Sequence, residues 1–263
     1  FIMTTGTAMN KTALITGATS GFGEACSRLL AKNGWRLIIT GRRRDRLHQL
    51  AHELSGLSEI LPLCFDVRDQ DAVASNLGNL QPQFGEIDAL VNNAGLALGL
   101  EAAPEASLSD WDIMVDTNIK GLLYCTRTIL PIMKRRNRGH IVNMGSVAGN
   151  WPYPGGNVYG ATKSFVKQFS LNLRADLLGT AIRVTNLEPG MAETEFAVVR
   201  FKGDEHKAKG VYEGMKPLSG EDIAEIVLWV LSLPPHVNIN TMEVMPVSQS
   251  WAFFAVDREL PPR

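Results

Sequence analysis

The sequence contains few of the residues from which metal sites and disulfides are built. Only three of its 263 residues are cysteines and five are histidines. Cys26, Cys64 and Cys125 lie far apart inside apolar segments, which indicates small buried side chains in a reducing compartment rather than disulfides. The histidines show no metal-ligand spacing, so we expect no metal.

Long apolar runs and an excess of charge are also missing. No segment approaches the roughly 20 apolar residues that a membrane-spanning helix needs. The net charge is −1 at pH 7, which gives no reason to expect nucleic acid or an anionic membrane as a partner. Residues 1–10 lack a signal-peptide pattern and are interpreted as an N-terminal extension that cloning could have added. We expect a cytoplasmic protein.

What the sequence does contain is a regular alternation of strand-like and helix-like segments. Such alternation predicts a parallel sheet with both faces covered, and right-handed crossovers make it doubly wound. We therefore expect a single α/β domain of the Rossmann type over residues 11–263. The predicted strands are residues 13–16, 35–40, 60–65, 87–91, 139–145, 180–188 and 242–245.

Two further segments shape that domain. A long helix is predicted from about Ser109 to Arg135, with Asp112 placed for a capping box and Pro131 able to kink its end. Residues 191–218 show no clear helix or strand pattern. Because a segment of that length in a compact domain is usually functional, we expect a lid there.

The first predicted strand leads into a glycine-rich turn, T-G-A-T-S-G-F-G, at residues 16–23. Gly17, Gly21 and Gly23 permit a tight turn and a close approach of the backbone to a phosphate at the next helix N-terminus. Loop glycines are by default only turn formers, and G-x-x-x-G-x-G is not the commoner spacing. The strand before and the helix after favour dinucleotide binding.

The end of the second predicted strand favours NADP(H) over NAD(H). An NAD site needs an acidic residue at this position, whereas here Gly41 is followed by Arg42 and Arg43. Guanidinium groups suit a 2′-phosphate. The alternative is an ordinary basic helix start, but arginines at a helix N-terminus oppose the helix dipole, so something anionic should compensate them.

A hydroxyl and a phenol–ammonium pair occur in the stretch 146–163, as Ser146, Tyr159 and Lys163. Tyr159 and Lys163 are spaced to share one face of a helix. The ammonium would lower the phenol pKa from its usual value of about 10, so that Tyr159 could exchange a proton with a substrate oxygen. Alone, this spacing is a weak signal, because it also occurs on solvated helix faces.

Together these motifs resemble the short-chain dehydrogenase/reductase family over nearly the whole chain. The matching positions are Thr16-Gly17, Gly21-Phe22-Gly23, Asp66, Asn92-Asn93-Ala94-Gly95, Asn118, Ser146, Tyr159, Lys163, Pro189-Gly190 and Thr194. The resemblance implies an oxidoreductase that acts on CH–OH groups and takes its hydride chemistry from the cofactor. It also implies a homotetramer.

The resemblance also implies residue roles. Tyr159 would be the general acid in reduction and the base in oxidation, and Lys163 would lower its pKa and hold the nicotinamide ribose. Ser146 would hydrogen-bond the substrate oxygen, and Asn118 would hold a water that links Lys163 to solvent. The implied cofactor-binding residues are Thr16, Gly17, Ser20, Gly21, Phe22, Gly23, Arg42, Arg43, Asp66, Val67, Asn92, Ala94, Gly95, Tyr159, Lys163, Pro189, Gly190 and Thr194.

Within the family, the stretches 149–163, 194–204 and 236–241 resemble the NADP-dependent 3-hydroxy acid dehydrogenase branch. That branch includes serine/L-allo-threonine dehydrogenases and malonic semialdehyde reductases, and sulfoacetaldehyde reductases look similar. We therefore expect NADPH-dependent interconversion of a small acidic aldehyde and its hydroxy acid. The choice between carboxylate and sulfonate stays open, as does the direction, although an NADP site suggests reduction.

A small anionic substrate needs a cation in the pocket. Arg200 is the best candidate because a guanidinium binds a carboxylate or sulfonate through two parallel hydrogen bonds, and Lys202 is the second. Tyr153 could add a phenol donor. The alternative is that Arg200 is solvated or paired with Glu195 or Asp204. The expected pocket wall consists of Trp151, Asn157 and Phe196.

Two other functions remain open from the sequence. One is a carbonyl reductase for bulkier neutral ketones, and the other is a cofactor-binding protein without turnover. The apolar segment 250–256 could cover a partner surface or fold back over its own pocket.

Overall fold

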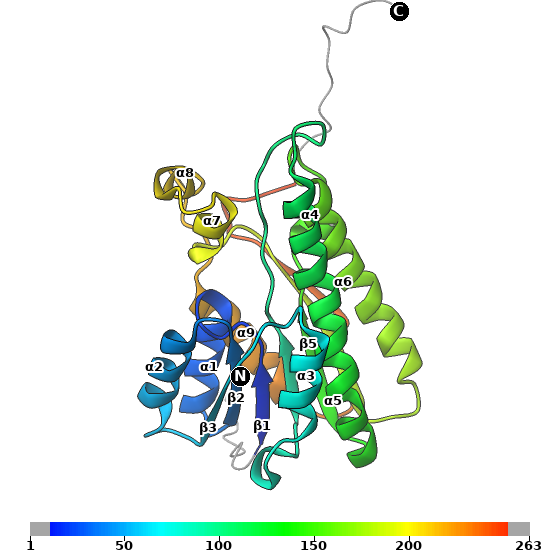
Figure 1. Ribbon diagram of the computed structural model, residues 1–263. Coiled ribbons are helices and arrows are strands. Elements are labelled where there is room, and N and C mark those ends of the chain that lie inside the picture. The colour runs from blue at the N-terminus through cyan, green and yellow to red at the C-terminus, as the bar shows by residue number, and fades with distance from the viewer. Residues whose placement is uncertain (1–10, 252–263) are drawn as a thin grey trace, which may run out of the picture.

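A parallel sheet of seven strands forms the centre of the computed structural model, which describes residues 11–251 (Figure 1). The strands lie in the order β3-β2-β1-β4-β5-β6-β7, and neighbours run parallel. Their bounds are Thr12–Ile15 (β1), Arg36–Gly41 (β2), Ile60–Cys64 (β3), Ala89–Asn92 (β4), Gly139–Met144 (β5), Ile182–Pro189 (β6) and Thr241–Val244 (β7). The predicted doubly wound α/β fold is confirmed.

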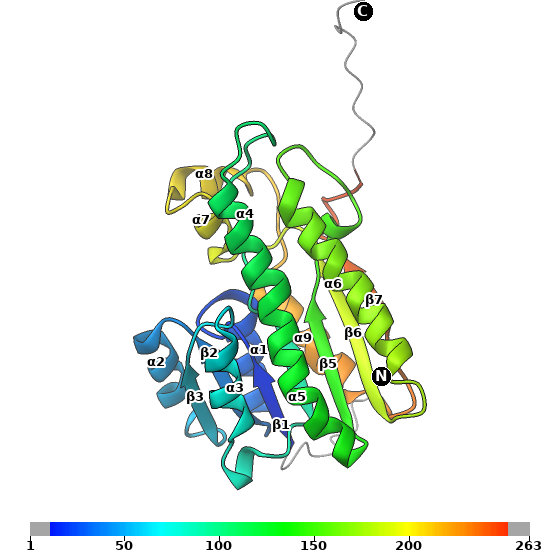
Figure 2. The same ribbon diagram turned by 45° about the vertical axis from the view of Figure 1, so that its right-hand side comes forward.

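Helices cover both faces of the sheet, and each face has its own apolar core (Figure 2). Ala13 belongs to one core and Leu14 to the other, which explains why the strand segments are apolar throughout. The first core is covered by α1 (Gly21–Lys32), α2 (Arg44–Leu54) and α9 (Gly220–Ser232). The second core is covered by α3 (Gln70–Gly78), α5 (Leu122–Arg136) and α6 (Asn157–Asp176).

The long helix predicted before β5 is interrupted by one turn of π-helix. It consists of α4 (Leu108–Val115), the π turn η2 (Asp116–Gly121) and α5. The helix begins at Leu108, one residue before the predicted start near Ser109. Its cap is Ser107, whose hydroxyl accepts a hydrogen bond from the Asp110 backbone amide at 3.3 Å, so the predicted capping pair of Ser109 and Asp112 is wrong. Pro131 lies inside α5, which continues to Arg136.

Residues 191–218 contain two short helices, α7 (Glu195–Arg200) and α8 (Glu205–Gly210), so the absence of regular elements expected from the sequence is wrong. Thr194 and Asp204 cap them through their side chains. Six residues are too few to display the apolar periodicity from which a helix is predicted. A bridge between Ala192 and Leu218 closes the base of the segment, which lies above the strand ends (Figure 1).

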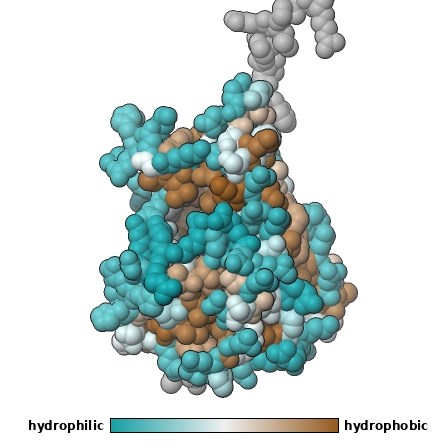
Figure 3. Space-filling model, in the orientation of Figure 1, coloured by the Kyte–Doolittle hydropathy of each residue, from teal (hydrophilic) through white to brown (hydrophobic). Residues whose placement is uncertain are grey.

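The loops that carry the predicted motifs all follow the carboxyl ends of strands. The strand order reverses between β1 and β4, and in sheets of this kind ligands bind in the crevice at that reversal. Figure 3 shows apolar surface gathered where α7 lies over these strand ends. Within residues 11–251, no helix is long and apolar enough to cross a membrane.

Candidate active site

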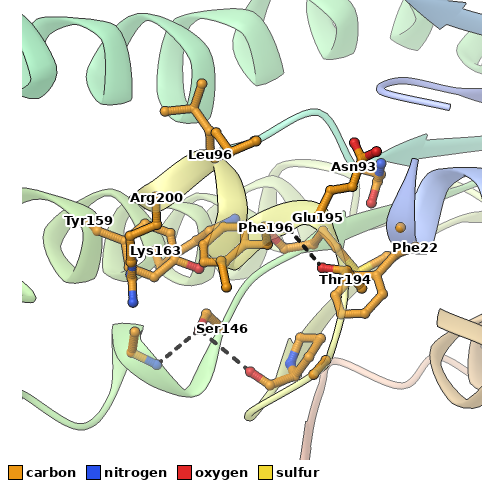
Figure 4. Close-up of a pocket in the computed structure, with 18 of the residues that line it drawn as sticks. Phe22, Asn93, Leu96, Ser146, Tyr159, Lys163, Thr194, Glu195, Phe196 and Arg200 are labelled. Carbon is orange, nitrogen blue, oxygen red and sulfur yellow. Dashed lines mark hydrogen bonds between the residues drawn. The ribbon is translucent and has the colours of Figure 1, made fainter. Parts of the chain in front are cut away.

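A cavity of about 790 Å³ opens at the carboxyl edge of the sheet, beneath α7 (Figure 4). Cavities of this size hold small-molecule ligands and cofactors. Most of the predicted site residues line it, namely Gly17, Ser20, Gly21, Phe22, Arg42, Arg43, Asp66, Val67, Ala94, Gly95, Ser146, Tyr153, Tyr159, Lys163, Pro189, Gly190, Thr194 and Arg200. Four other predicted site residues lie behind this lining: Thr16, Gly23, Asn92 and Asn118.

The glycine turn after β1 lines the cavity and is held in place by the loop after β4. Gly17 adopts a φ of 68°, a left-handed conformation that favours glycine. A Cβ at position 23 would lie 2.4 Å from the side-chain nitrogen (Nδ2) of Asn93 and from the backbone oxygen of Gly17, so only glycine fits there. The Thr16 hydroxyl accepts hydrogen bonds from the Asn93 and Ala94 amides at 3.0 and 2.9 Å. This open cradle of backbone suits the phosphates of a dinucleotide.

Asn93, rather than the predicted Asn92, lines the cavity at the end of β4. The side-chain nitrogen (Nδ2) of Asn93 donates to the backbone oxygens of Thr16 and Gly17 at 2.9 and 3.1 Å, which fixes the glycine turn. Asn92 is buried and donates instead to Thr126 and Asn143, both at 2.9 Å. The predicted direct contact of Asn92 with the cofactor is therefore replaced by a supporting position beneath the site.

Arg43 immediately precedes α2 and holds the glycine turn through two of its nitrogens. Its Nε donates to the Thr19 hydroxyl at 3.1 Å, and its Nη2 donates to the Ser20 hydroxyl at 2.7 Å. Its Nη1 donates to Glu195 at 2.6 Å. The anionic compensation that the helix dipole demands thus comes from Glu195, at the start of α7.

Arg42 lies at the rim of the cavity beside Asp66. Its Nη1 is 3.7 Å from Asp66, and Arg68 donates to the same carboxylate at 2.7 Å. Burial acts to raise the pKa of Asp66, but the hydrogen bonds from Arg68 outweigh it and the pKa is lowered. Asp66 therefore remains ionised, and the Arg42 side chain stays largely exposed at the cavity rim.

The four predicted catalytic residues come from three elements and meet at one end of the cavity. Tyr159 and Lys163 lie on α6, Ser146 caps the short helix η3 (Val147–Gly149), and Asn118 lies in η2. The Lys163 ammonium lies 5.8 Å from the centre of the Tyr159 ring. The Asn118 oxygen and the Lys163 nitrogen lie 3.3 and 3.4 Å from the point where Gly95 would carry a Cβ.

The protonation of Tyr159 differs from the expectation of a lowered pKa. Burial raises the pKa of Tyr159 to about 12, although the Ser146 hydroxyl and the Arg200 guanidinium act to lower it. Burial also lowers the pKa of Lys163 to about 8. The Lys163 ammonium donates to the Met144 carbonyl at 2.8 Å, away from the phenol oxygen. Tyr159 is therefore a neutral phenol near neutral pH, which is the state that can donate a proton.

The Asn118 side chain uses its hydrogen bonds within the protein. Its oxygen accepts from the Leu96 amide at 2.9 Å, and its nitrogen donates to the Leu96 carbonyl at 2.8 Å and to the Thr162 hydroxyl at 3.0 Å. These contacts join η2, α6 and the loop after β4. The water-holding role implied for Asn118 stays a prediction.

Arg200 ends α7 and directs its guanidinium into the cavity (Figure 4). Its Nη2 donates to the Tyr153 hydroxyl at 2.9 Å, and the group lies 5.0 Å from the centre of the Tyr159 ring. Its Nε is buried and has no hydrogen-bond partner within residues 11–251. The alternative partners are engaged elsewhere, because Glu195 pairs with Arg43 and Asp204 caps α8.

Lys202 and Asn157 face away from this cavity. The Lys202 ammonium is 2.7 Å from Asp110 and lies outside the lining. Asn157 donates to the Glu101 carbonyl at 3.1 Å and likewise lies outside it. Arg200 is therefore the predicted substrate cation that reaches the pocket.

Two tryptophans that share one carboxylate line the cavity, Trp151 and Trp251. The indole nitrogens of Trp151 and Trp251 donate to Glu243 on β7 at 2.8 and 3.2 Å. The Gln249 side-chain oxygen accepts from the Met191 backbone amide at 2.7 Å, which brings Gln249 to the base of the α7–α8 segment. The described start of the tail thus lies over its own cavity, whereas residues 252–256 of the predicted apolar tail lie outside the described residues.

Several lining residues were missed by the sequence reasoning. Asn93 could have been found, since it lies within the motif that follows β4. Gln249 carried no usable signal, because loop residues show no periodicity and its contact with Met191 spans distant parts of the chain. Thr19 and Trp251 lie in segments that the sequence singles out, the glycine-rich turn and the apolar tail, but neither was predicted as a site residue. Other missed lining residues include Leu96, Met144, Gly145, Met191 and Tyr212.

Known proteins resemble this chain over nearly its whole length. Residues 11–205 match the family described as short chain dehydrogenase. The NADP-dependent 3-hydroxy acid dehydrogenase YdfG of Salmonella typhi is 58% identical over 246 residues, which is 93% of this chain and 98% of that protein. Sulfoacetaldehyde reductase 2 of Chromohalobacter salexigens is 52% identical, over 95% of this chain and 100% of that protein.

A solved structure is also similar to this chain over nearly its whole length. The closed form of a serine dehydrogenase complexed with NADP+ superposes with a TM-score of 0.91 at 55% identity. The match covers 94% of this chain and 100% of that one.

Proposed function

The chain belongs to the short-chain dehydrogenase/reductase family and is an NADP-dependent oxidoreductase, and from this premise we propose that it interconverts a small acidic aldehyde and its hydroxy acid. The substrate would carry its carboxylate or sulfonate on the carbon next to the reacting carbon or one carbon further away. The proposal is in keeping with the names of its relatives, which include a 3-hydroxy acid dehydrogenase and a sulfoacetaldehyde reductase.

The observation that carries the proposal is the environment of Arg200. Its guanidinium is bonded by one phenol, that of Tyr153, and its buried Nε has no partner within the described residues. A partly buried cation without a counter-charge is unfavourable, and a carboxylate or sulfonate would supply two acceptor oxygens to it. A neutral ketone would leave this guanidinium without a counter-charge. An anionic substrate therefore fits this end of the cavity best.

In reduction, the residues beside Arg200 would act on the carbonyl oxygen. Arg200 and Tyr153 would hold the acidic group, so that the aldehyde carbon lies toward Tyr159. Tyr159 would donate its phenol proton to the carbonyl oxygen, and the Ser146 hydroxyl would hydrogen-bond the same oxygen as charge develops on it. NADPH supplies the hydride when bound.

The other half of the cavity would hold the cofactor. The glycine turn would receive the pyrophosphate, and Arg42 and Arg43 would receive the 2′-phosphate. Asp66 and Val67 would flank the adenine, and Pro189, Gly190 and Thr194 would seat the nicotinamide end. Lys163 would hold the nicotinamide ribose.

A kinetic panel tests the substrate proposal. Malonic semialdehyde, sulfoacetaldehyde, succinic semialdehyde and a bulky neutral ketone would be tested for reduction, and serine and L-allo-threonine for oxidation, each with NADP(H) and NAD(H). We expect the highest kcat/KM with one of the small anions and NADP(H). Activity on bulky neutral ketones with none on these anions would contradict the proposal and favour the alternative carbonyl reductase.

Two further properties stay predictions. A homotetramer is implied by the family resemblance, and sedimentation velocity would test it. The cytoplasmic location is also untested, and fractionation of the source cells would decide it.

A further inference from the structure

Glu195 holds a position between two arginines at the phosphate end of the cavity. One carboxylate oxygen accepts from Arg43 at 2.6 Å and the other from Arg46 at 2.5 Å. Glu195 and Arg43 both line the cavity, and each side chain is about two-fifths exposed. A carboxylate of the protein is thus paired with Arg43 at the end of the cavity where a cofactor phosphate would bind.

The geometry of Arg43 leaves little room for a second anion. An arginine presents five N–H donors in a fixed plane. The Nε and Nη2 of Arg43 are bonded to Thr19 and Ser20 of the glycine turn, so the Nη1 edge is the part that faces outward. Glu195 takes this edge. An incoming phosphate would have to share or replace it, and two anions at such close range repel each other.

We propose that Glu195 competes with the 2′-phosphate of the cofactor for Arg43, and is therefore a residue that sets the balance between NADP(H) and NAD(H). When the phosphate binds, Glu195 gives up Arg43 and keeps Arg46. NAD(H) has no 2′-phosphate and would leave the pair intact. The proposal depends on the assignment of Arg43 to the phosphate, which the experiment below tests separately.

The same contact explains why an acidic residue is present at a phosphate site. Arg42 and Arg43 precede α2, and Arg44 and Arg46 lie in its first turn. Their positive charges oppose the helix dipole and repel one another. Glu195 compensates two of them. Glu195 therefore stabilises the protein without cofactor and weakens binding of the phosphorylated cofactor, so its removal should move stability and affinity in opposite directions.

The experiment compares Glu195→Gln with the wild-type protein. Dissociation constants for NADPH and NADH would be measured by the fluorescence of the bound nicotinamide. Calorimetry would measure adenosine 2′,5′-bisphosphate and 5′-AMP, which probe the phosphate end alone. We expect NADPH and the bisphosphate to bind about fivefold more tightly to the variant, with NADH and 5′-AMP within about twofold, since a charge-assisted contact of this kind has that size.

Thermal unfolding gives a readout that a purely structural role would not reproduce. Glu195→Gln should lower the Tm without ligand by about 2 °C and increase the Tm rise caused by the bisphosphate. A purely structural Glu195 would lower the Tm and leave or reduce the affinity. Glu193→Gln is the matched control, because Glu193 lies two residues away, is exposed and forms no ion pair within residues 11–251. It should change neither quantity.

An unchanged or weaker affinity of Glu195→Gln for NADPH would overturn the proposal, and so would an equal gain for NADH. Arg43→Ala separates the proposal from the assignment on which it rests. If Arg43→Ala leaves the preference for NADPH over NADH unchanged, the phosphate is held elsewhere and both fail. If Arg43→Ala removes the preference but Glu195→Gln has no effect, the assignment stands and the competition is refuted.

Discussion

The two ends of the cavity each present an arginine, but the surroundings of the two arginines differ. At the end proposed for the cofactor phosphate, here called the phosphate end, Arg43 is bonded to Thr19, Ser20 and the carboxylate of Glu195. At the end proposed for the substrate, here called the substrate end, Arg200 is surrounded by aromatic rings, bonded by one phenol, and has a buried nitrogen without a partner in the described chain. A carboxylate compensates the charge of the first arginine at the cavity rim, whereas no carboxylate within residues 11–251 forms an ion pair with the second.

One short helix supplies both differences. Glu195 begins α7 and Arg200 ends it, so α7 brings an anion to the phosphate end and a cation to the substrate end. An arginine is therefore not an anion site by its residue type alone. It becomes one where the folded chain leaves its charge without a counter-charge, and this depends on contacts between distant residues. The predictions below test this contrast, from the largest expected effect to the smallest.

Replacing Tyr159 by Phe should have the largest effect, and this effect should be confined to the substrate end. The change removes the proton donor and keeps the ring, so kcat should fall by about 10³-fold, within the range for general acid catalysis. The dissociation constant for NADPH should remain close to that of the wild type. Steady-state kinetics and a fluorescence titration measure the two quantities. Full turnover in the variant would refute the role of Tyr159.

Replacing Arg200 by Ala should lower kcat/KM for malonic semialdehyde or sulfoacetaldehyde by about 100-fold. The physical reason is the loss of a partly buried, charge-assisted contact with the acidic group, which typically costs several kcal/mol. The matched control is Lys202→Ala, since Lys202 is also a lid cation but pairs with Asp110 outside the cavity. If the control lost as much activity as Arg200→Ala, the contrast between the two cations would be wrong.

Replacing Arg43 by Ala should act at the opposite end of the cavity. We expect the dissociation constant for NADPH to rise by about tenfold and that for NADH to change little, because a surface contact with phosphate is worth less than a buried one. KM for the aldehyde at saturating cofactor should be unaffected. Titrations with both cofactors measure this. An equal loss for NADPH and NADH would mean that Arg43 only shapes the glycine turn.

A last effect concerns stability rather than activity and depends on the pKa of Lys163, which burial lowers to about 8 from 10.5. Between these values the unfolded chain binds more protons than the folded chain, so this group makes stability rise with pH, by up to about 1.4 kcal/mol per pH unit. The raised pKa of Tyr159 acts only above its unfolded value of 10.0. Between about pH 8 and 10, the stability that wild type gains should therefore be absent from Lys163→Met.

Urea unfolding of both proteins across that pH window measures the difference. Parallel pH profiles for wild type and Lys163→Met would contradict the lowered pKa of Lys163.

The sequence was sufficient for the fold, and most of the site residues predicted from it line the cavity. Apolar strands and helix signals are local, and each predicted strand end lies within two residues of the observed one. The glycine turn, Ser146, Tyr159 and Lys163 follow from motifs that form within one loop or one helix turn. The NADP preference was also predicted, and the comparisons confirm it.

The features that escaped prediction depend on contacts between distant segments. Glu195 lies 152 positions from Arg43, and Glu243 lies 92 positions from Trp151, so neither contact leaves a local pattern. The pKa of Tyr159 was expected to fall because Lys163 is one turn away, but burial dominates, and burial is known only once the helix is packed. The helices α7 and α8 were missed because each has only six residues.

The choice between Asn92 and Asn93 required the exact end of β4. Asn92 is the last residue of the strand and points into the buried network with Thr126 and Asn143. The side chain of Asn93 leaves the sheet and turns back to the glycine turn. A shift of one residue exchanges the two faces of a strand, and sequence patterns do not fix strand ends that closely.

The most direct measurement compares malonic semialdehyde with its methyl ester in the wild-type enzyme. The two aldehydes share the reacting group and differ in the charge at the position that Arg200 is proposed to bind. The account predicts a kcat/KM with NADPH at least about 100-fold higher for the acid, because the ester leaves the guanidinium without a counter-charge. Equal values, or a preference for the ester, would contradict the account.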